Sequence, residues 1–177
     1  MRIGILGLVT ALGGAAAAAG FAGNRREEQT FTIYPIGTVE REGGRTFLAI
    51  HEKYARGLAG LEGFSHVQVL YWFDKNDTPQ KRAILQVHPR GRAQNPLTGV
   101  FACRAPVRPN LIGLSTCRIL SVEGNRVRID EIDAFDHTPL VDLKPFIPTD
   151  APTRDVRVPD WAARPEDAPE PPGKDPR

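Results

Sequence analysis

Short apolar stretches rich in β-branched and aromatic residues recur along the middle of this chain, separated by glycine, proline and asparagine. This pattern predicts strands rather than helices, because strands are short and end at turn-forming residues. The run VQVLYWF predicts a buried central strand. Alternation of Val127 and Ile129 with charged residues predicts one arm of a half-solvated hairpin. The predicted strands cover residues 31–39, 46–50, 67–73, 83–88, 113–122 and 126–132, and the one helical stretch covers 53–61.

The close spacing of these strands favours an all-β barrel or sandwich over alternating strands and helices. We expect a compact, single-domain β-barrel with one or two short helices. No G-x-G-x-x-G or G-x-x-x-x-G-K-[ST] motif is present, so nothing indicates a dinucleotide fold or a P-loop. The predicted barrel domain covers residues 31–148.

Both ends of the chain differ from this middle part. In residues 1–24, Arg2 precedes an apolar run that is followed by small residues, which is typical of a secretory signal peptide or, less well matched, a membrane anchor. A start assigned too far upstream is a third interpretation. Residues 149–177 are rich in proline and poor in aliphatic residues, which predicts an extended tail that becomes disordered beyond about Trp161.

Charge is unevenly distributed. The whole chain has a formal net charge of only +2, yet residues 81–118 contain no acidic residue. Such a tract is typical of a surface that contacts phosphates, although a solvated face with few acids has the same composition. Its basic residues are Lys81, Arg82, Arg90, Arg92, Arg104, Arg108 and Arg118.

Within this tract, the block GVFACRAPVRPNLIGLS at residues 99–115 is crowded with proline. Proline fixes φ and lacks an N–H donor, so the block predicts a stiff loop. A stiff loop holds Arg104 and Arg108 with little loss of entropy on binding, and a guanidinium group matches carboxylate or phosphate. We therefore expect a preorganised site for an anionic ligand.

A second cluster lies at residues 133–146, where Asp142 and Lys144 are two positions apart in an extended stretch and therefore point the same way. They are placed to meet a zwitterion, or they form an ordinary surface ion pair. The four histidines do not have zinc-motif spacing, so we expect no metal site. Cys103 and Cys117 lie among small or apolar neighbours and are expected to be inert, buried thiols.

Four blocks together resemble the TsaA-like, or TrmO-type, tRNA methyltransferases: GLEGFSHVQVLYWF, LQVHPRG, GVFACRAPVRPNLIGLS and IDAFDHTPLVDLKP. The resemblance covers residues 33–148. It implies a homodimeric β-barrel that binds S-adenosylmethionine and methylates N6 of threonylcarbamoyladenosine beside the tRNA anticodon.

The resemblance also implies site residues. Asp142 is the expected catalytic residue, which holds the methionine amine or the target nitrogen. The expected substrate-binding residues are His88, Arg90, Arg108 and Asn110. The expected cofactor-binding residues are Asp74, Lys75, Arg104, Leu114, Val141, Asp142, Leu143 and Lys144.

The chain departs from the family pattern at three positions. His137 replaces a glycine, which suggests either a positive φ or a close approach of the backbone at that position. Leu111 replaces a proline and Cys103 a common threonine, and residues 40–45 contain no counterpart of a proline-arginine-glutamine loop.

S-adenosylmethionine, the methyl donor, and tRNA are both cytoplasmic. We therefore expect this protein in the cytoplasm if residues 1–24 do not act as a signal peptide or anchor. An exported or tethered chain would instead be a non-catalytic barrel that binds a small anion or carboxylate. A cytoplasmic protein that binds nucleotide or tRNA without catalysis is the third alternative.

Overall fold

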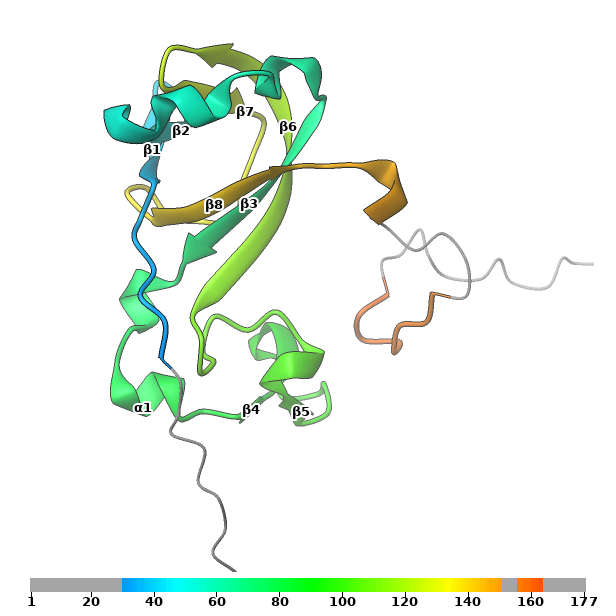
Figure 1. The fold of residues 1–177 in the computed structure, drawn as a ribbon. Coiled ribbons are helices and arrows are strands. Elements are labelled where there is room, and N and C mark those ends of the chain that lie inside the picture. The colour runs from blue at the N-terminus through cyan, green and yellow to red at the C-terminus, as the bar shows by residue number, and fades with distance from the viewer. Residues whose placement is uncertain (1–29, 151–155, 164–177) are drawn as a thin grey trace, which may run out of the picture. The chain divides into compact units, whose positions relative to one another are not determined.

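The computed structural model describes residues 30–150 and 156–163 and contains a closed β-barrel (Figure 1). The barrel order is β1-β2-β7-β6-β3-β8, and all neighbouring strands are antiparallel. This confirms the predicted all-β barrel. The barrel strands are β1 (Gly37–Glu42), β2 (Arg45–Ile50), β3 (His66–Trp72), β6 (Ile112–Glu123), β7 (Arg126–Ile129) and β8 (Pro139–Pro145).

Helical structure in the described residues is short. The single α-helix, α1, covers Pro79–Arg82. The stretch predicted as a helix at 53–61 is instead the 3-10 helix η1 (Glu52–Leu58) followed by η2 (Leu61–Gly63), and Gly60 between them has a φ of 88°. The other 3-10 turns are η3 (Asp74–Asn76), η4 (Pro89–Gly91), η5 (Val100–Ala102) and η6 (Pro148–Asp150).

Strand β3 forms the centre of the core, as its composition predicted. Val67, Val69 and Tyr71 are buried, while the residues between them are half-buried. Alternation of this kind follows from the two-residue period of a strand, which places every second side chain on the inner face. The buried apolar cluster around them comprises Val39, Leu48, Ile50, Leu58, Cys117, Val127, Ile129, Ile132 and Leu140.

Two glycine features shape the β1 side of the barrel. Gly43 and Gly44 both have positive φ, 55° and 74°, and form the two-residue turn between the paired residues Glu42 and Arg45. Gly37 lies where β1 pairs with both β2 and β8, and a Cβ at this position would collide with the backbone of Ala49. The barrel therefore closes at a position where no side chain fits.

Several predicted strand bounds are wrong. Residues 31–39 contain a strand only from Gly37, because Pro35 lacks the N–H that an earlier ladder position needs. Residues 83–88 contribute only β4 (Gln86–Val87), which pairs with β5 (Thr98–Gly99) in a separate two-stranded sheet. β7 ends at Ile129, three residues before the predicted end at 132.

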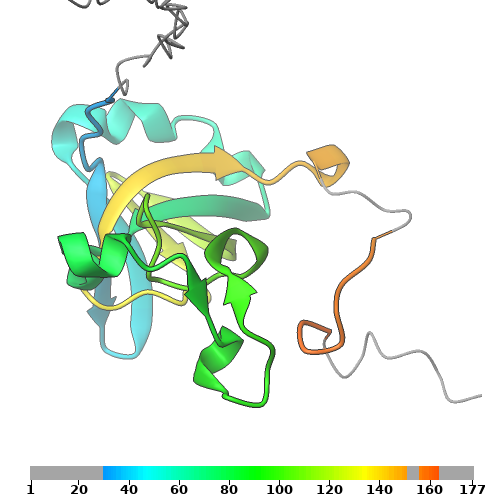
Figure 2. The ribbon, with the colours of Figure 1, turned by 90° about the horizontal axis from the view of Figure 1, so that it is seen from below.

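Residues 73–111 lie between β3 and β6 and form a lobe at one end of the barrel, which contains α1 and the β4–β5 sheet (Figures 1 and 2). The Pro-rich block 99–115 is a loop over residues 103–111, as predicted. Its first residues belong to β5 and η5, and its last four to β6.

The predicted leader at 1–24 lies outside the described residues, as does most of the predicted tail at 149–177. Within residues 30–150 and 156–163, no helix has both the length and the apolar character needed to span a membrane.

Candidate functional site

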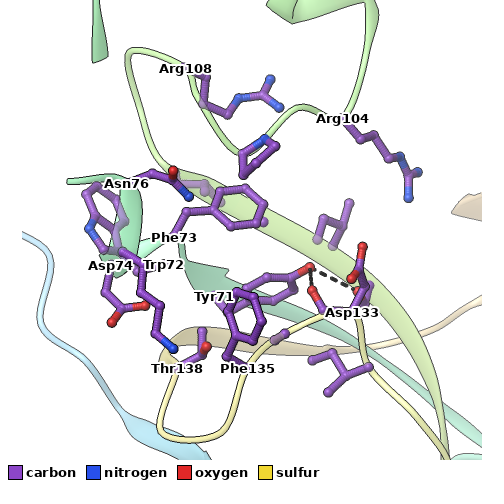
Figure 3. Close-up of a pocket in the computed structure, with 18 of the residues that line it drawn as sticks. Tyr71, Trp72, Phe73, Asp74, Asn76, Arg104, Arg108, Asp133, Phe135 and Thr138 are labelled. Atoms are coloured by element: carbon purple, nitrogen blue, oxygen red, sulfur yellow. Dashed lines mark hydrogen bonds between the residues drawn. The ribbon is translucent and has the colours of Figure 1, made fainter. Parts of the chain in front are cut away.

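A cavity of about 1180 Å³ lies where β3 ends and β6 begins (Figure 3). Three chain segments enclose it: the end of β3 with η3, the loop 103–111, and the loop 130–138 that leads into β8. The volume is somewhat above the roughly 300 to 1,000 Å³ that is usual for ligand sites. Its lining combines aromatic rings, arginines and carboxylates.

Most of the aromatic lining comes from the last two residues of β3, Tyr71 and Trp72, and from Phe73 directly after it. Tyr71 packs edge-on against Phe73, with ring centroids 5.5 Å apart. Gly113 on β6 lies directly against the Tyr71 ring, so that a side chain at position 113 would displace it. The Phe73 amide donates to the Leu111 carbonyl over 2.8 Å, which joins the end of β3 to the loop 103–111.

The basic side of the cavity is the loop 103–111, which presents Arg104 and Arg108 (Figure 3). Arg82 fixes the end of this loop, because its Nη1 donates to the Pro109 carbonyl over 2.9 Å while its Nε pairs with Asp77 at 2.8 Å. The Arg82 guanidinium also lies 5.3 Å from the Trp72 ring centroid. Hydrogen bonds from Arg82 and Trp72 lower the pKa of Asp77. Arg82 thus differs from the other basic residues of the tract, because its guanidinium group holds the loop 103–111 in place.

The loop 130–138 forms the opposite side of the cavity and presents Asp133 and Phe135. The Tyr71 hydroxyl donates to the Asp133 carbonyl over 2.9 Å. Burial raises the pKa of Tyr71, so the phenol stays protonated and keeps this donor. Arg41 on β1 binds the same loop through the carbonyls of Ile132 and Ala134.

Six of the predicted site residues line this cavity. They come from the β3–η3 junction, the Pro-rich loop and β6, and comprise Asp74, Lys75, Arg104, Arg108, Asn110 and Leu114. His88 and Arg90 do not line it. Both are exposed on the lobe, where His88 Nδ1 lies 2.7 Å from the Asn95 carbonyl and Arg90 has a φ of 59°.

The four predicted cofactor residues of β8 do not line the cavity either: Val141, Asp142, Leu143 and Lys144. Asp142 and Leu143 instead line a smaller hollow of about 350 Å³ beside η1, together with Ile50 and Tyr54. Within one chain, Arg104 and Asp142 therefore line two different hollows. Asp142 lies opposite Leu70, and β3 reaches the cavity only at the next residue, after a register shift.

Asp142 and Lys144 do meet each other, as their spacing predicted. Their side chains form an ion pair of 2.8 Å, and Asp142 Oδ1 also accepts the Leu143 amide over 2.9 Å. The hydrogen bond from Lys144 to Asp142 raises the pKa of the ammonium group. Both side chains are about half exposed, 46% for Asp142 and 61% for Lys144, and remain accessible to a further partner.

Several cavity residues were not expected from the sequence. Tyr71, Trp72 and Phe73 were predicted only as members of a core strand, although three aromatic residues at the end of a strand and next to a charged turn were a usable signal. Phe101 and Phe135 gave none, because a single phenylalanine in a loop does not reveal its neighbours.

The two cysteines differ in environment. Cys117 is buried, with 1% of its surface exposed, and burial raises its pKa to about 12. Cys103 is half-buried and lines the cavity. The inert-thiol interpretation thus fits Cys117 better than Cys103. In the described part of the chain, no group of three His, Cys, Asp or Glu side chains is arranged to hold a metal ion.

The sequence of residues 29–151 matches the family model of the tRNA-methyltransferase O N-terminal domain. The chain belongs to this family. The match includes the whole barrel and all three segments around the cavity, so this TrmO-type domain contains the complete candidate site.

Relatives of the TrmO-type domain are found among both binding proteins and enzymes. A probable S-adenosyl-L-methionine-binding protein of Methanocaldococcus jannaschii is 47% identical over 116 residues, which is 66% of this chain and 92% of that protein. A mouse tRNA (adenine(37)-N6)-methyltransferase is 44% identical over 90 residues, or 51% of this chain and 20% of the mouse protein. The crystal structure of TrmO from P. aeruginosa superimposes with a TM-score of 0.61 at 30% identity, covering 79% of this chain and 65% of that one.

Proposed function

We propose that this chain is an S-adenosylmethionine-dependent methyltransferase that acts on N6 of an adenosine in tRNA. The observation that supports this most directly is the cavity itself, which joins cationic, carboxylate and aromatic groups within a TrmO-type domain. The finer proposal is that the adenosine carries a threonylcarbamoyl group and lies next to the anticodon.

The cavity has the chemistry that S-adenosylmethionine requires. Its methionine part carries a carboxylate, which matches Arg104 or Arg108, and an ammonium group, which matches Asp74 or Asp133. Its adenine matches the aromatic rings of Trp72 and Phe73. When bound, the cofactor supplies an electrophilic methyl group on a sulfonium. These residues would hold and orient it, and orientation is the main requirement, because good alignment alone can supply about 7 to 11 kcal/mol.

A polyanionic substrate fits the lobe beside the cavity. Arg90 and Arg92 are exposed, and the tract from residue 81 to 118 carries no acid. Exposed arginines of this kind contact phosphates and release counterions. The RNA backbone would thus lie across the lobe while one base enters the cavity.

Asp142 enters this proposal through a second copy of the chain. The family resemblance assigns Arg104 and Asp142 to one site, whereas a single chain carries them on two separate hollows. In a homodimer, β8 of one copy can border the cavity of the other. Such an arrangement brings Asp142 of one copy to the site that contains Arg104 of its partner. The Asp142 carboxylate then accepts a hydrogen bond from the target nitrogen or from the methionine amine.

The experiment combines binding and chemistry. Titration calorimetry with S-adenosylmethionine is expected to show binding that the Arg104→Ala variant weakens at least tenfold. Mass spectrometry of tRNA nucleosides from a strain that lacks this gene is expected to show loss of an N6-methylated adenosine derivative. Binding of the cofactor without any change in tRNA would favour the non-catalytic binding module, and no binding would exclude the enzyme.

A further inference from the structure

Phe135 is a large apolar side chain that the fold leaves in solvent at the side of the cavity. It lines the cavity from the loop 130–138, and 67% of its surface is exposed (Figure 3). A single exposed phenylalanine is common on protein surfaces. Phe135 is distinguished by how firmly its backbone is held and by the charges around it.

The backbone on both sides of Phe135 is fixed by hydrogen bonds. The carbonyl before it, on Ala134, accepts Arg41 Nη2 over 2.9 Å. The Phe135 carbonyl accepts the Thr138 amide over 3.2 Å, and the His137 amide donates to Val39 of β1 over 2.8 Å. The ring is therefore presented on a loop anchored to the barrel, which reduces the entropy lost when a ligand packs against it.

Positively charged side chains lie close to the ring. Lys75 Nζ lies 4.3 Å from the Phe135 ring centroid, and Arg104 and Arg108 line the same cavity. Aromatic rings combined with Lys and Arg are the usual means by which proteins hold unpaired nucleotides, because the rings stack on bases and the cations meet phosphates. Asp74, Asp133 and Asp136 line the same cavity, so the lining is mixed in charge, and an apolar protein partner would leave these charges without counterparts.

We propose that Phe135 is the surface on which an unpaired nucleobase of the RNA substrate stacks, with Lys75 beside it to meet the adjoining phosphate. This inference rests on the proposed function and deepens it by naming the side chain that receives the base. Taking a base out of its stack costs energy, and stacking on a preset ring offsets part of that cost.

The test uses variants that separate stacking from packing. Phe135→Leu keeps an apolar side chain but loses the ring, Phe135→Trp keeps a stacking surface, and Phe64→Leu is a matched control at an exposed phenylalanine outside the cavity. The probe is an anticodon stem–loop RNA with 2-aminopurine in place of the target adenine, whose fluorescence is quenched by stacking. Melting temperatures within about 2 °C of wild type verify that each variant folds.

The expected result is about fivefold to a hundredfold weaker binding and reduced quenching for Phe135→Leu, with Phe135→Trp and Phe64→Leu close to wild type. Binding by Phe135→Leu within twofold of wild type would overturn the inference. Calorimetry with S-adenosylmethionine and methyl transfer by the wild type are measured in parallel. If the wild type transfers methyl groups and Phe135→Leu does so with unchanged KM for RNA, only the stacking role is wrong; if the wild type transfers none, the proposed function fails.

Discussion

The Arg41 guanidinium donates a 2.9 Å hydrogen bond to the carbonyl oxygen of Ala134, which lies 93 positions later in the chain. A second bond from the same Nη2 reaches the Ile132 carbonyl over 3.0 Å, and Nη1 lies 3.3 Å from the Thr46 hydroxyl. One side chain thus fixes the loop that supplies Asp133 and Phe135 to the cavity.

Arg41 is therefore expected to act as a positioning residue. Both loop carbonyls accept from Nη2, and Nη1 reaches Thr46, so the two ends of the guanidinium fork hold the loop and β2 together. Lysine has a single terminal nitrogen and no planar fork, so Arg41→Lys should lose at least one of these three hydrogen bonds. We expect a loss of about 1 to 2 kcal/mol in the free energy of unfolding and at least tenfold weaker S-adenosylmethionine binding.

Thermal melting and calorimetry measure the two effects, with Arg45→Lys at the exposed start of β2 as the control. A variant that is less stable but binds the cofactor with wild-type affinity would show that Arg41 only stabilises the fold.

His137 has a φ of 63°, in the left-handed region that the family glycine suggested. A side chain in this region costs about 1 to 2 kcal/mol, whereas glycine avoids that cost but loses about 0.5 to 1 kcal/mol of entropy on folding. His137→Gly should therefore raise the free energy of unfolding by up to about 1 kcal/mol.

His137→Val is the opposing control, because a branched side chain at positive φ is strained further. Urea denaturation measures both variants. The histidine side chain is 81% exposed, so either substitution removes little packing. A less stable His137→Gly variant would mean that the interaction with Asp136 outweighs the backbone strain.

The barrel was predictable because the alternation along β7, the β-branched and aromatic content of β3 and the short apolar run of β2 are local properties of the sequence. Arg104 was predicted because it lies in a dense Pro-rich block, and Asp74 was implied only by the family resemblance. The position of Phe135 depends on Arg41, whose bonds span more than ninety residues. Asp142 lines a different hollow from Arg104 for a related reason: the register shift at Leu70/Tyr71 sets which residue of β8 lies opposite each residue of β3, and no local pattern encodes it.

The proposed RNA-binding lobe makes a salt-dependent prediction. Arg90→Gln combined with Arg92→Gln removes two exposed positive charges that do not line the cavity. Binding of tRNA should weaken, and the slope of log K against log salt should fall by about 1 for each phosphate that an arginine no longer neutralises. Cofactor binding should not change.

Filter binding of tRNA between about 50 and 200 mM salt measures this slope. Arg45→Gln combined with Arg128→Gln on the barrel is the control with the same change in net charge. An equal reduction of the slope in both double variants would indicate nonspecific attraction rather than binding through the lobe.

The two thiols should respond differently to alkylation. Cys103 lines the cavity, so iodoacetamide at pH 8 should modify it first and S-adenosylmethionine should slow that reaction. Cys117 should react only after unfolding, because 1% of its surface is exposed. Peptide mass spectrometry assigns the modified site, and labelling of Cys103 at the same rate with and without cofactor would place the cofactor elsewhere.

Cys117 also gives the fold a pH dependence. Its pKa is raised from 9.0 to about 12 in the folded state, mainly by burial, so between these values the unfolded chain loses a proton that the folded chain keeps. Stability should therefore be unaffected below about pH 8 and fall as the pH rises through this window. Urea denaturation measures the free energy of unfolding at pH 8 and pH 10.5. The loss of stability between these two pH values should be smaller for Cys117→Ala than for wild type, and the loss that remains comes from Tyr71, whose pKa is also raised.

The proposed homodimer predicts that two inactive variants restore each other. Arg104→Ala removes a side chain from the cavity, and Asp142→Ala removes one from the separate hollow on β8. Each homodimer lacks one of the two groups at both sites and should be nearly inactive. Its barrel should melt as wild type, because both side chains are substantially exposed.

A mixed dimer contains one copy of each variant. If each site takes Arg104 from one copy and Asp142 from the other, this dimer has one site with both defects and one intact site. Equimolar mixing with subunit exchange should then recover about a quarter of wild-type methyl transfer, because half of the dimers are mixed and each of these has one intact site. If Arg104 and Asp142 of the same chain acted together, every site would carry one defect, and no activity would return on mixing. Wild-type activity of Asp142→Ala alone would remove Asp142 from the reaction altogether.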